Sequence, residues 1–149
     1  LHSPYTLSLH DALPILDNQL CFRLYATSRE VIKLYKPLLD KYNLTYTQYV
    51  TMLVLWEEEK STVKDIGIRL HLDSGTLTPL LKKLENMGLI IRYRDKNDDR
   101  VVIAELTQKG VELKEELIEV PNKMMCKINI PKEQVEKLAK NLDDLLKIL

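Results

Sequence analysis

The feature that most constrains this chain is a pair of short, largely apolar strands joined by a charged loop. Residues 90–94 and 101–106 read as two strands, and the polar loop 95–100 lies between them. The hairpin carries four basic side chains between Arg92 and Arg100. By itself this pattern is equally typical of an ordinary surface hairpin. The segments before it must therefore decide its interpretation.

Side chains that cap helices mark three helix starts before the hairpin. Thr45 and Gln48 have the spacing of a capping box, in which two side chains satisfy free backbone amides. Thr62 is placed to cap a second, short helix, and Asp73 with Ser74 a third. Gly88 is well placed to end the third helix. The inward side of that helix is predicted to hold Leu77, Leu80, Leu81, Leu84 and Met87.

Two capped helices joined by a tight link at residues 71–72 and followed by a basic hairpin predict a winged helix-turn-helix. We therefore expect a mainly α fold with a small β-hairpin wing that grips a DNA duplex. The second helix would enter the major groove, and the wing arginine suits a narrow minor groove. For Ser74 and Thr76, simple helix capping is the alternative role. The predicted DNA-binding residues are Ser74, Gly75, Thr76, Pro79, Lys82, Lys83, Asp98 and Arg100.

The charge of the chain favours nucleic acid only weakly. Lysines and arginines equal the acids, 22 to 22, and residues 61–100 hold eight basic against six acidic side chains, a local excess of +2. No apolar run approaches the roughly 20 residues needed to cross a bilayer, so no membrane partner is expected. The two cysteines and three histidines lack ligand-like spacing, which predicts neither a metal site nor a cofactor.

Apolar stripes near both ends of the chain predict a two-fold dimer. Residues 16–42 read as one helix that Pro37 should kink or break, and residues 111–120 as another that Pro121 interrupts. Pro131 then opens a last helix. Its stripe is typical either of a core-facing helix or of a subunit interface. We favour the interface because this helix and the apolar residues Leu20, Leu24 and Leu34 lie at opposite ends of the chain and can pair away from the DNA-binding unit. A two-fold dimer would place two recognition helices about one duplex turn apart. The stripe consists of Val135, Leu138, Leu142, Leu145 and Leu149.

The first 15 residues differ from the rest of the chain in composition. They hold two of the three histidines, two of the six prolines and no basic residue, unlike a secretory signal. We expect residues 1–15 to be a non-native or disordered leader; the alternative is a natural arm that packs on a partner subunit. Residues 16–149 would form a single domain, with a DNA-binding unit at about 45–110 and dimerisation helices at 16–44 and 111–149.

The sequence from residue 16 to residue 149 resembles the MarR family of bacterial transcriptional regulators. Asp98-Asp99-Arg100, followed by Leu106-Thr107 and Gly110, matches the wing signature of that family. Segments 16–22, 35–39, 44–46 and 72–82 resemble its organic hydroperoxide sensor branch, OhrR. The resemblance implies a cytoplasmic homodimeric repressor on a pseudo-palindromic operator of double-stranded DNA.

The resemblance also implies that Cys21 senses organic hydroperoxide. The start of the first helix favours an anionic sulfur, whose oxidation to a sulfenic acid would release the operator. Tyr35 and Tyr46 match the tyrosines that hydrogen-bond this sulfur in the family. Cys126 lies where some members carry a second cysteine, on the partner subunit, that forms a disulfide with the first. Considered without the resemblance, Cys21 is interpreted as a buried structural thiol, and a passive thiol is the alternative for Cys126.

Three other functions compete with a peroxide-sensing repressor. The first is a MarR-type repressor released by a small aromatic acid. The second is a thiol peroxidase, which the basic wing and the lack of a second catalytic constellation in the sequence argue against. The third is a structural dimerisation module, which would leave Cys21 and the two tyrosines unexplained.

Overall fold

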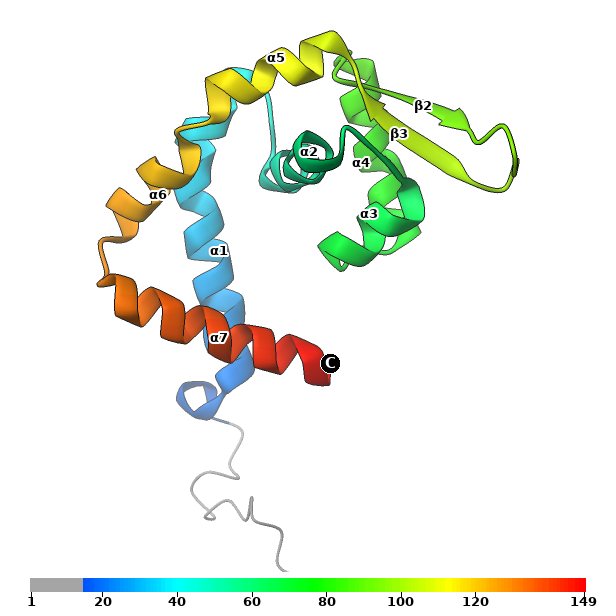
Figure 1. The fold of residues 1–149 in the computed structure, drawn as a ribbon. Helices are drawn as coiled ribbons and strands as arrows, with labels where there is room; N and C mark the ends of the chain where they lie inside the picture. The colour runs from blue at the N-terminus through cyan, green and yellow to red at the C-terminus, as the bar shows by residue number, and fades with distance from the viewer. Residues whose placement is uncertain (1–14) are drawn as a thin grey trace, which may run out of the picture.

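The part of the chain that the computed structural model describes, residues 15–149, contains seven α-helices and one small sheet that lies at one edge of the molecule (Figure 1). The leader expected at residues 1–15 therefore lies outside the described residues except for Ile15. Two 3-10 turns, at Leu16–Asn18 and Asp40–Tyr42, flank the first helix. The elements are α1 Leu20–Leu39, α2 Tyr46–Glu58, β1 Lys60–Thr62, α3 Val63–Leu70, α4 Ser74–Asn86, β2 Ile90–Arg94, β3 Val102–Leu106, α5 Gln108–Leu117, α6 Val120–Ile128 and α7 Lys132–Ile148.

The three predicted helix caps are confirmed, and they fix where the helices of the DNA-binding unit begin. Thr45 and Gln48 form the complete capping box at the start of α2. The Thr62 hydroxyl accepts from the Asp65 amide at 3.0 Å before α3. Asp73 Oδ1 accepts from the Thr76 amide at 2.8 Å before α4. Each oxygen satisfies a backbone amide that the first helical turn leaves without a partner.

The predicted hairpin is confirmed, with β2 and β3 antiparallel and Arg92 opposite Ala104. The second strand begins at Val102 rather than at residue 101. A third strand was not predicted: β1 pairs with the far side of β3, which gives the order β1-β3-β2. Lys60–Thr62 is too short and too polar to alternate visibly, and only its long-range pairing with β3 makes it a strand.

The core lies inside the helix-turn-helix unit and extends to the α5–α6 connection. Of the five side chains predicted inward on α4, four leucines are buried and Met87 is half-buried. Gly88 follows α4 with φ +74°, a left-handed conformation that glycine adopts without strain, so the predicted end of this helix is confirmed. The fully buried residues include Met52, Leu55, Ile66, Leu77, Leu81, Leu84 and Ala104.

Two proline predictions need correction. Pro37 does not break the first helix, because α1 continues through it to Leu39, only two residues later. Pro121 does not interrupt a helix either. It lies in the first turn of α6, after α5 has already ended at Leu117, and there its missing amide needs no partner.

Both chain ends expose apolar side chains. None of the residues of α7 is buried, although Leu138, Leu142 and Leu146 lie along it. In α1 only Leu39 is buried, and Leu20 and Phe22 are exposed. Of the two alternatives for the last helix, the core-facing one is therefore wrong within a single chain, and the subunit interface is left. No described helix is long and apolar enough to span a membrane.

Candidate functional site

The N-terminal end of α4 presents a row of small polar residues to solvent. Ser74, Gly75 and Thr76 form its exposed first turn, and Asp73 fixes that turn through its cap. Because Asp73 accepts from the Thr76 amide, the Ser74 and Thr76 hydroxyls are not needed as caps. Further along α4, the predicted residues that also lie exposed are Pro79, Lys82 and Lys83.

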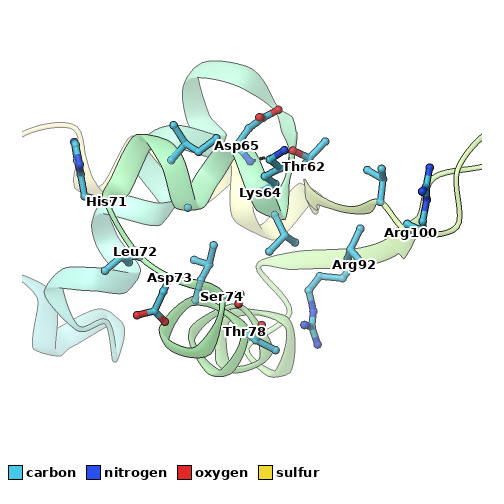
Figure 2. A pocket seen from close by; sticks show the side chains of 16 residues that line it. Thr62, Lys64, Asp65, His71, Leu72, Asp73, Ser74, Thr78, Arg92 and Arg100 are labelled. Atoms are coloured by element: carbon cyan, nitrogen blue, oxygen red, sulfur yellow. Dashed lines mark hydrogen bonds between the residues drawn. The ribbon is translucent and has the colours of Figure 1, made fainter.

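A cleft of about 1050 Å³ is lined by residues of α3, of the N-terminal half of α4 and of the sheet and its wing loop (Figure 2). Of the predicted DNA-binding residues, Ser74 and Arg100 line it. Lys64, His71 and Arg92 also line it and were not predicted. The sequence carried a usable signal for Lys64, a cation in the first turn of a capped helix. His71 was predicted only as part of the tight link at residues 71–72, and it ends α3 in a left-handed conformation.

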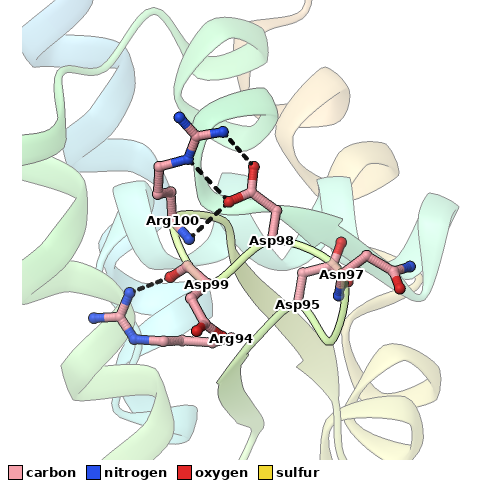
Figure 3. A network of polar contacts seen from close by, with 6 residues as sticks. All are labelled: Arg94, Asp95, Asn97, Asp98, Asp99 and Arg100. Carbon is pink, nitrogen blue, oxygen red and sulfur yellow. Dashed lines mark hydrogen bonds and ion pairs between the residues drawn. The ribbon is translucent and has the colours of Figure 1, made fainter.

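Ion pairing within the wing loop holds Arg100 in place (Figure 3). Asp98 accepts from Arg100 Nε at 3.0 Å, from Nη2 at 3.1 Å and from the Arg100 backbone amide at 3.1 Å. The hydrogen bonds from Arg100 hold the pKa of Asp98 below its usual range, and the Asp98 carboxylate raises the pKa of Arg100. The side chain of Arg100 is nevertheless 90% exposed. Asp98 therefore orients an exposed guanidinium.

A second ion pair joins the sheet to α4. Arg92 donates from Nε to Glu85 Oε2 at 3.2 Å and from Nη2 to Oε1 at 3.4 Å. The pair is partly shielded from solvent, and Arg92 lowers the pKa of the Glu85 carboxyl. In Figure 2 the Arg92 side chain extends from the sheet toward α4. The pair thus sets the position of β2 relative to the last turns of α4.

Cys21 is the second residue of α1, and its side chain is exposed. The placement near a helix start was predicted, whereas the alternative of a buried structural thiol is wrong for the single chain. An exposed thiol at this position is open to attack by an oxidant from solvent.

Tyr35 and Tyr46 are brought together, but not beside Cys21 of the same chain. Their ring centroids lie 4.8 Å apart. Cys21 and Tyr35 are both in α1, and 14 residues of helix separate their backbones by roughly 21 Å at 1.5 Å per residue. A hydrogen bond between this sulfur and either phenol within one chain is therefore excluded. The sequence pattern could not reveal this separation before the extent of α1 was known.

The two tyrosines line a small cavity of about 250 Å³ between the end of α1 and the start of α2. Ile32, Leu39 and Leu44 provide apolar walls. Burial raises the pKa of the Tyr35 phenol, and the neighbouring Tyr46 raises it further. Most of the exposed lining of this cavity is apolar. The cavity therefore suits an apolar group together with an acceptor for a phenol hydrogen.

Cys126 is exposed on α6, beside the C-terminal half of α1 (Figure 1). The neighbouring Lys127 donates to the Leu34 carbonyl at 3.3 Å, which anchors α6 there. Cys21 lies in the first turn of α1, about 20 Å along the helix from Leu34. Within one chain, Cys21 thus lies at the start of α1, whereas Cys126 lies on α6 beside the C-terminal half of α1.

The chain is similar in sequence and in fold to known transcriptional regulators. A family profile described as Transcriptional regulator SarA/Rot matches residues 33–117. The Organic hydroperoxide resistance transcriptional regulator of Bacillus subtilis (strain 168) is 50% identical over 134 residues, which cover 90% of this chain and 91% of that protein. Reduced AbfR bound to DNA superposes with a TM-score of 0.75 at 37% identity, covering 89% of this chain and 92% of that one. Disulfide-formed AbfR superposes with a TM-score of 0.64 at 37% identity, over 88% and 92%.

Proposed function

Because this chain belongs to the SarA/Rot transcriptional regulators and to the OhrR-like branch of the MarR family, we propose that it is a homodimeric DNA-binding repressor that Cys21 oxidation releases. The effector would be an organic hydroperoxide. The observation that carries the proposal is the exposed thiol in the first turn of α1, in a chain half identical to an organic hydroperoxide resistance regulator.

DNA would be held by α4 and the wing of each subunit. The exposed first turn of α4 suits the major groove, where Ser74 and Thr76 reach base edges and Gly75 allows close approach. Lys82 and Lys83 suit phosphates. Arg100, oriented by Asp98, suits the minor groove. A reduced relative bound to DNA superposes better on this fold than its disulfide form does, which supports a binding-competent conformation.

Dimerisation would complete the sensing site. The exposed leucines of α7 and the apolar first half of α1 supply the interface. Since Cys21 lies about 21 Å from Tyr35 of its own chain, the phenols that hold this sulfur would be the partner subunit's Tyr35 and the partner subunit's Tyr46. The apolar walls of the tyrosine cavity would accept the organic part of the peroxide. Apolar walls also favour an alkyl hydroperoxide over hydrogen peroxide, which has no group to place there.

The chemistry needs no cofactor. The Cys21 sulfur attacks the terminal oxygen of ROOH, so an S–O bond forms and the O–O bond breaks. The alkoxide takes a proton and leaves as ROH, with Cys21 oxidised to a sulfenic acid. The thiolate of the partner subunit's Cys126 then attacks this sulfur, forms the disulfide and expels hydroxide, which a proton converts to water. Two sulfurs must approach to about 2 Å, so α1 and α6 of the two subunits would move.

A band-shift titration on the upstream DNA of the gene tests the proposal. The reduced protein is expected to bind, and cumene hydroperoxide is expected to release it. Cys21→Ser should bind as tightly as the unchanged protein and stay bound at the same peroxide dose. Cys126→Ser is the matched control, since it removes the other thiol and should still form the sulfenic acid.

Three outcomes would count against a repressor that senses peroxide through Cys21. Release of Cys21→Ser at the same dose would reject the thiol mechanism. Release by a salicylate-like acid, with Cys21 blocked, would point to a ligand-controlled regulator. Repeated turnover of peroxide with a thiol reductant and no binding to any sequence in a random-site selection would point to a peroxidase.

A further inference from the structure

Four aromatic rings form a continuous series from the tyrosine cavity to the far end of α2. The ring centroid of Tyr46 lies 4.8 Å from that of Tyr35, and Tyr35 lies 5.9 Å from Tyr49. Tyr49 meets the ring of Trp56 edge-on at 6.4 Å. Tyr46, Tyr49 and Trp56 are three and seven residues apart on α2, so they share one face of that helix.

The last ring of the series ends on a tightly packed junction. Trp56 Nε1 donates to the Gly110 carbonyl at 2.8 Å, in the first turn of α5. A Cβ on Gly110 would lie 2.2 Å from the Leu89 carbonyl oxygen, so only glycine fits at this contact. Thr107 immediately precedes this turn. Its amide donates to the Leu89 carbonyl at 3.1 Å, and its hydroxyl donates to the Gly88 carbonyl at 2.6 Å. The start of α5 is thereby fixed to the end of α4.

The centre of this series is tightly packed, whereas the other three rings are half-buried. Tyr49 is only 2% exposed. Burial is the main cause that raises the pKa of its phenol, and the neighbouring Tyr35 and Tyr46 raise that pKa further. Close-packed interiors transmit a displacement instead of absorbing it, because a gap of even half an ångström loses dispersion contacts. A shift of Tyr35 or Tyr46 would therefore move Tyr49 and, through α2, the Trp56 contact with Gly110.

We propose that Tyr49 and Trp56 are positioning residues that carry the oxidation signal from the tyrosine cavity to the junction between α5 and the recognition helix α4. This inference rests on the proposed function, since it assumes that Cys21 oxidation disturbs the two tyrosines. Neither residue would touch peroxide or DNA. Their task is to couple the two sites, so their loss should reduce the response to oxidation while both end reactions persist.

The coupling is measured as the ratio of the DNA dissociation constants of oxidised and reduced protein. Trp56→Phe keeps an aromatic ring and removes only the N–H donor. Its reduced form should bind DNA within about twofold of the unchanged protein. Its ratio should fall about fivefold, the equivalent of one lost intramolecular hydrogen bond. Dimedone trapping should show the sulfenic acid at Cys21 forming at the unchanged rate.

Tyr42→Phe is the matched control. Tyr42 also donates to a carbonyl of α5, that of Glu116 at 3.4 Å, but it is not part of the ring series. This variant should keep the unchanged ratio. Because Trp56 is the single tryptophan, its fluorescence gives a second measurement on the unmodified chain. Peroxide should shift the emission, and Cys21→Ser should abolish the shift.

Each outcome decides the inference. A lowered ratio in Trp56→Phe alone supports it. An unchanged ratio in Trp56→Phe, or an equal fall in both variants, overturns it, because the first shows no coupling and the second only general loosening. If the unmodified protein binds DNA equally before and after oxidation, the proposed function itself fails and takes the inference with it. That result differs from the failure of the inference alone, in which the unmodified protein still responds.

Discussion

Gly110 offers a quantitative test of the contact that joins α5 to the end of α4. In Gly110→Ala the new Cβ would lie 2.2 Å from the Leu89 carbonyl oxygen and 3.2 Å from the Leu89 carbonyl carbon. Real Cβ atoms keep at least 3.0 Å, so backbone must move by about 0.8 Å. Overpacking of this kind costs about 1–3 kcal/mol, and a strained Trp56 hydrogen bond adds about 1 kcal/mol.

The better helix propensity of alanine returns up to about 1 kcal/mol. The net loss in free energy of unfolding is therefore about 1–3 kcal/mol. Urea denaturation at a fixed protein concentration, followed by Trp56 fluorescence, measures it. Gly75→Ala is the matched control, because its Cβ would meet only the side-chain oxygen of Asp73, at 3.2 Å. It should stay within about 1 kcal/mol of the unchanged protein. Equal midpoints for the two variants would refute the close contact at Gly110.

Two further predictions concern the subunit interface and the buried phenols. Leu142→Glu should give a monomer in sedimentation velocity, because α7 buries none of its residues within one chain and its exposed leucines are expected to form the interface. Lys140→Glu, on the opposite side of α7, should remain dimeric. A dimeric Leu142→Glu would contradict the interface. Burial raises the pKa of Tyr35 and Tyr49 above 10.0. The neutral phenol is thus favoured in the folded protein, and the stability it provides is complete below pH 10 and lost as the pH rises toward the folded values. Tyrosinate absorbance of the unchanged protein should contain a late component that Tyr35→Phe and Tyr49→Phe each reduce, and an absorbance curve that neither substitution changes at high pH would contradict this.

Local signals in the sequence predicted the DNA-binding unit well. Thr45, Thr62 and Asp73 cap helices through atoms only three residues away, so spacing alone reveals them. Gly88 ends α4 for an equally local reason, its positive φ. The strand β1 was missed because three polar residues become a strand only by pairing with β3, more than 40 residues later.

Contacts between distant parts of the chain had no comparable signal. The Glu85–Arg92 pair spans a turn whose geometry is not visible in the sequence. The stripe on α7 suits a core as well as an interface, and only its exposure in the folded chain decides between them. The two tyrosines were named through a family resemblance, which does not indicate which subunit supplies them. Their separation from Cys21 follows from the uninterrupted length of α1.

The length of α1 has a genetic consequence. Suppose that each sensing site combines Cys21 of one chain with the phenols of another. A Cys21→Ser chain, and a chain that lacks the Tyr35 and Tyr46 hydroxyls, then each fail to respond to peroxide when expressed alone. Expressed together, they form mixed dimers in which one site has both defects and the other is intact. Two inactive alleles would thus restore induction by complementation, an outcome that sensing confined to one polypeptide could never produce.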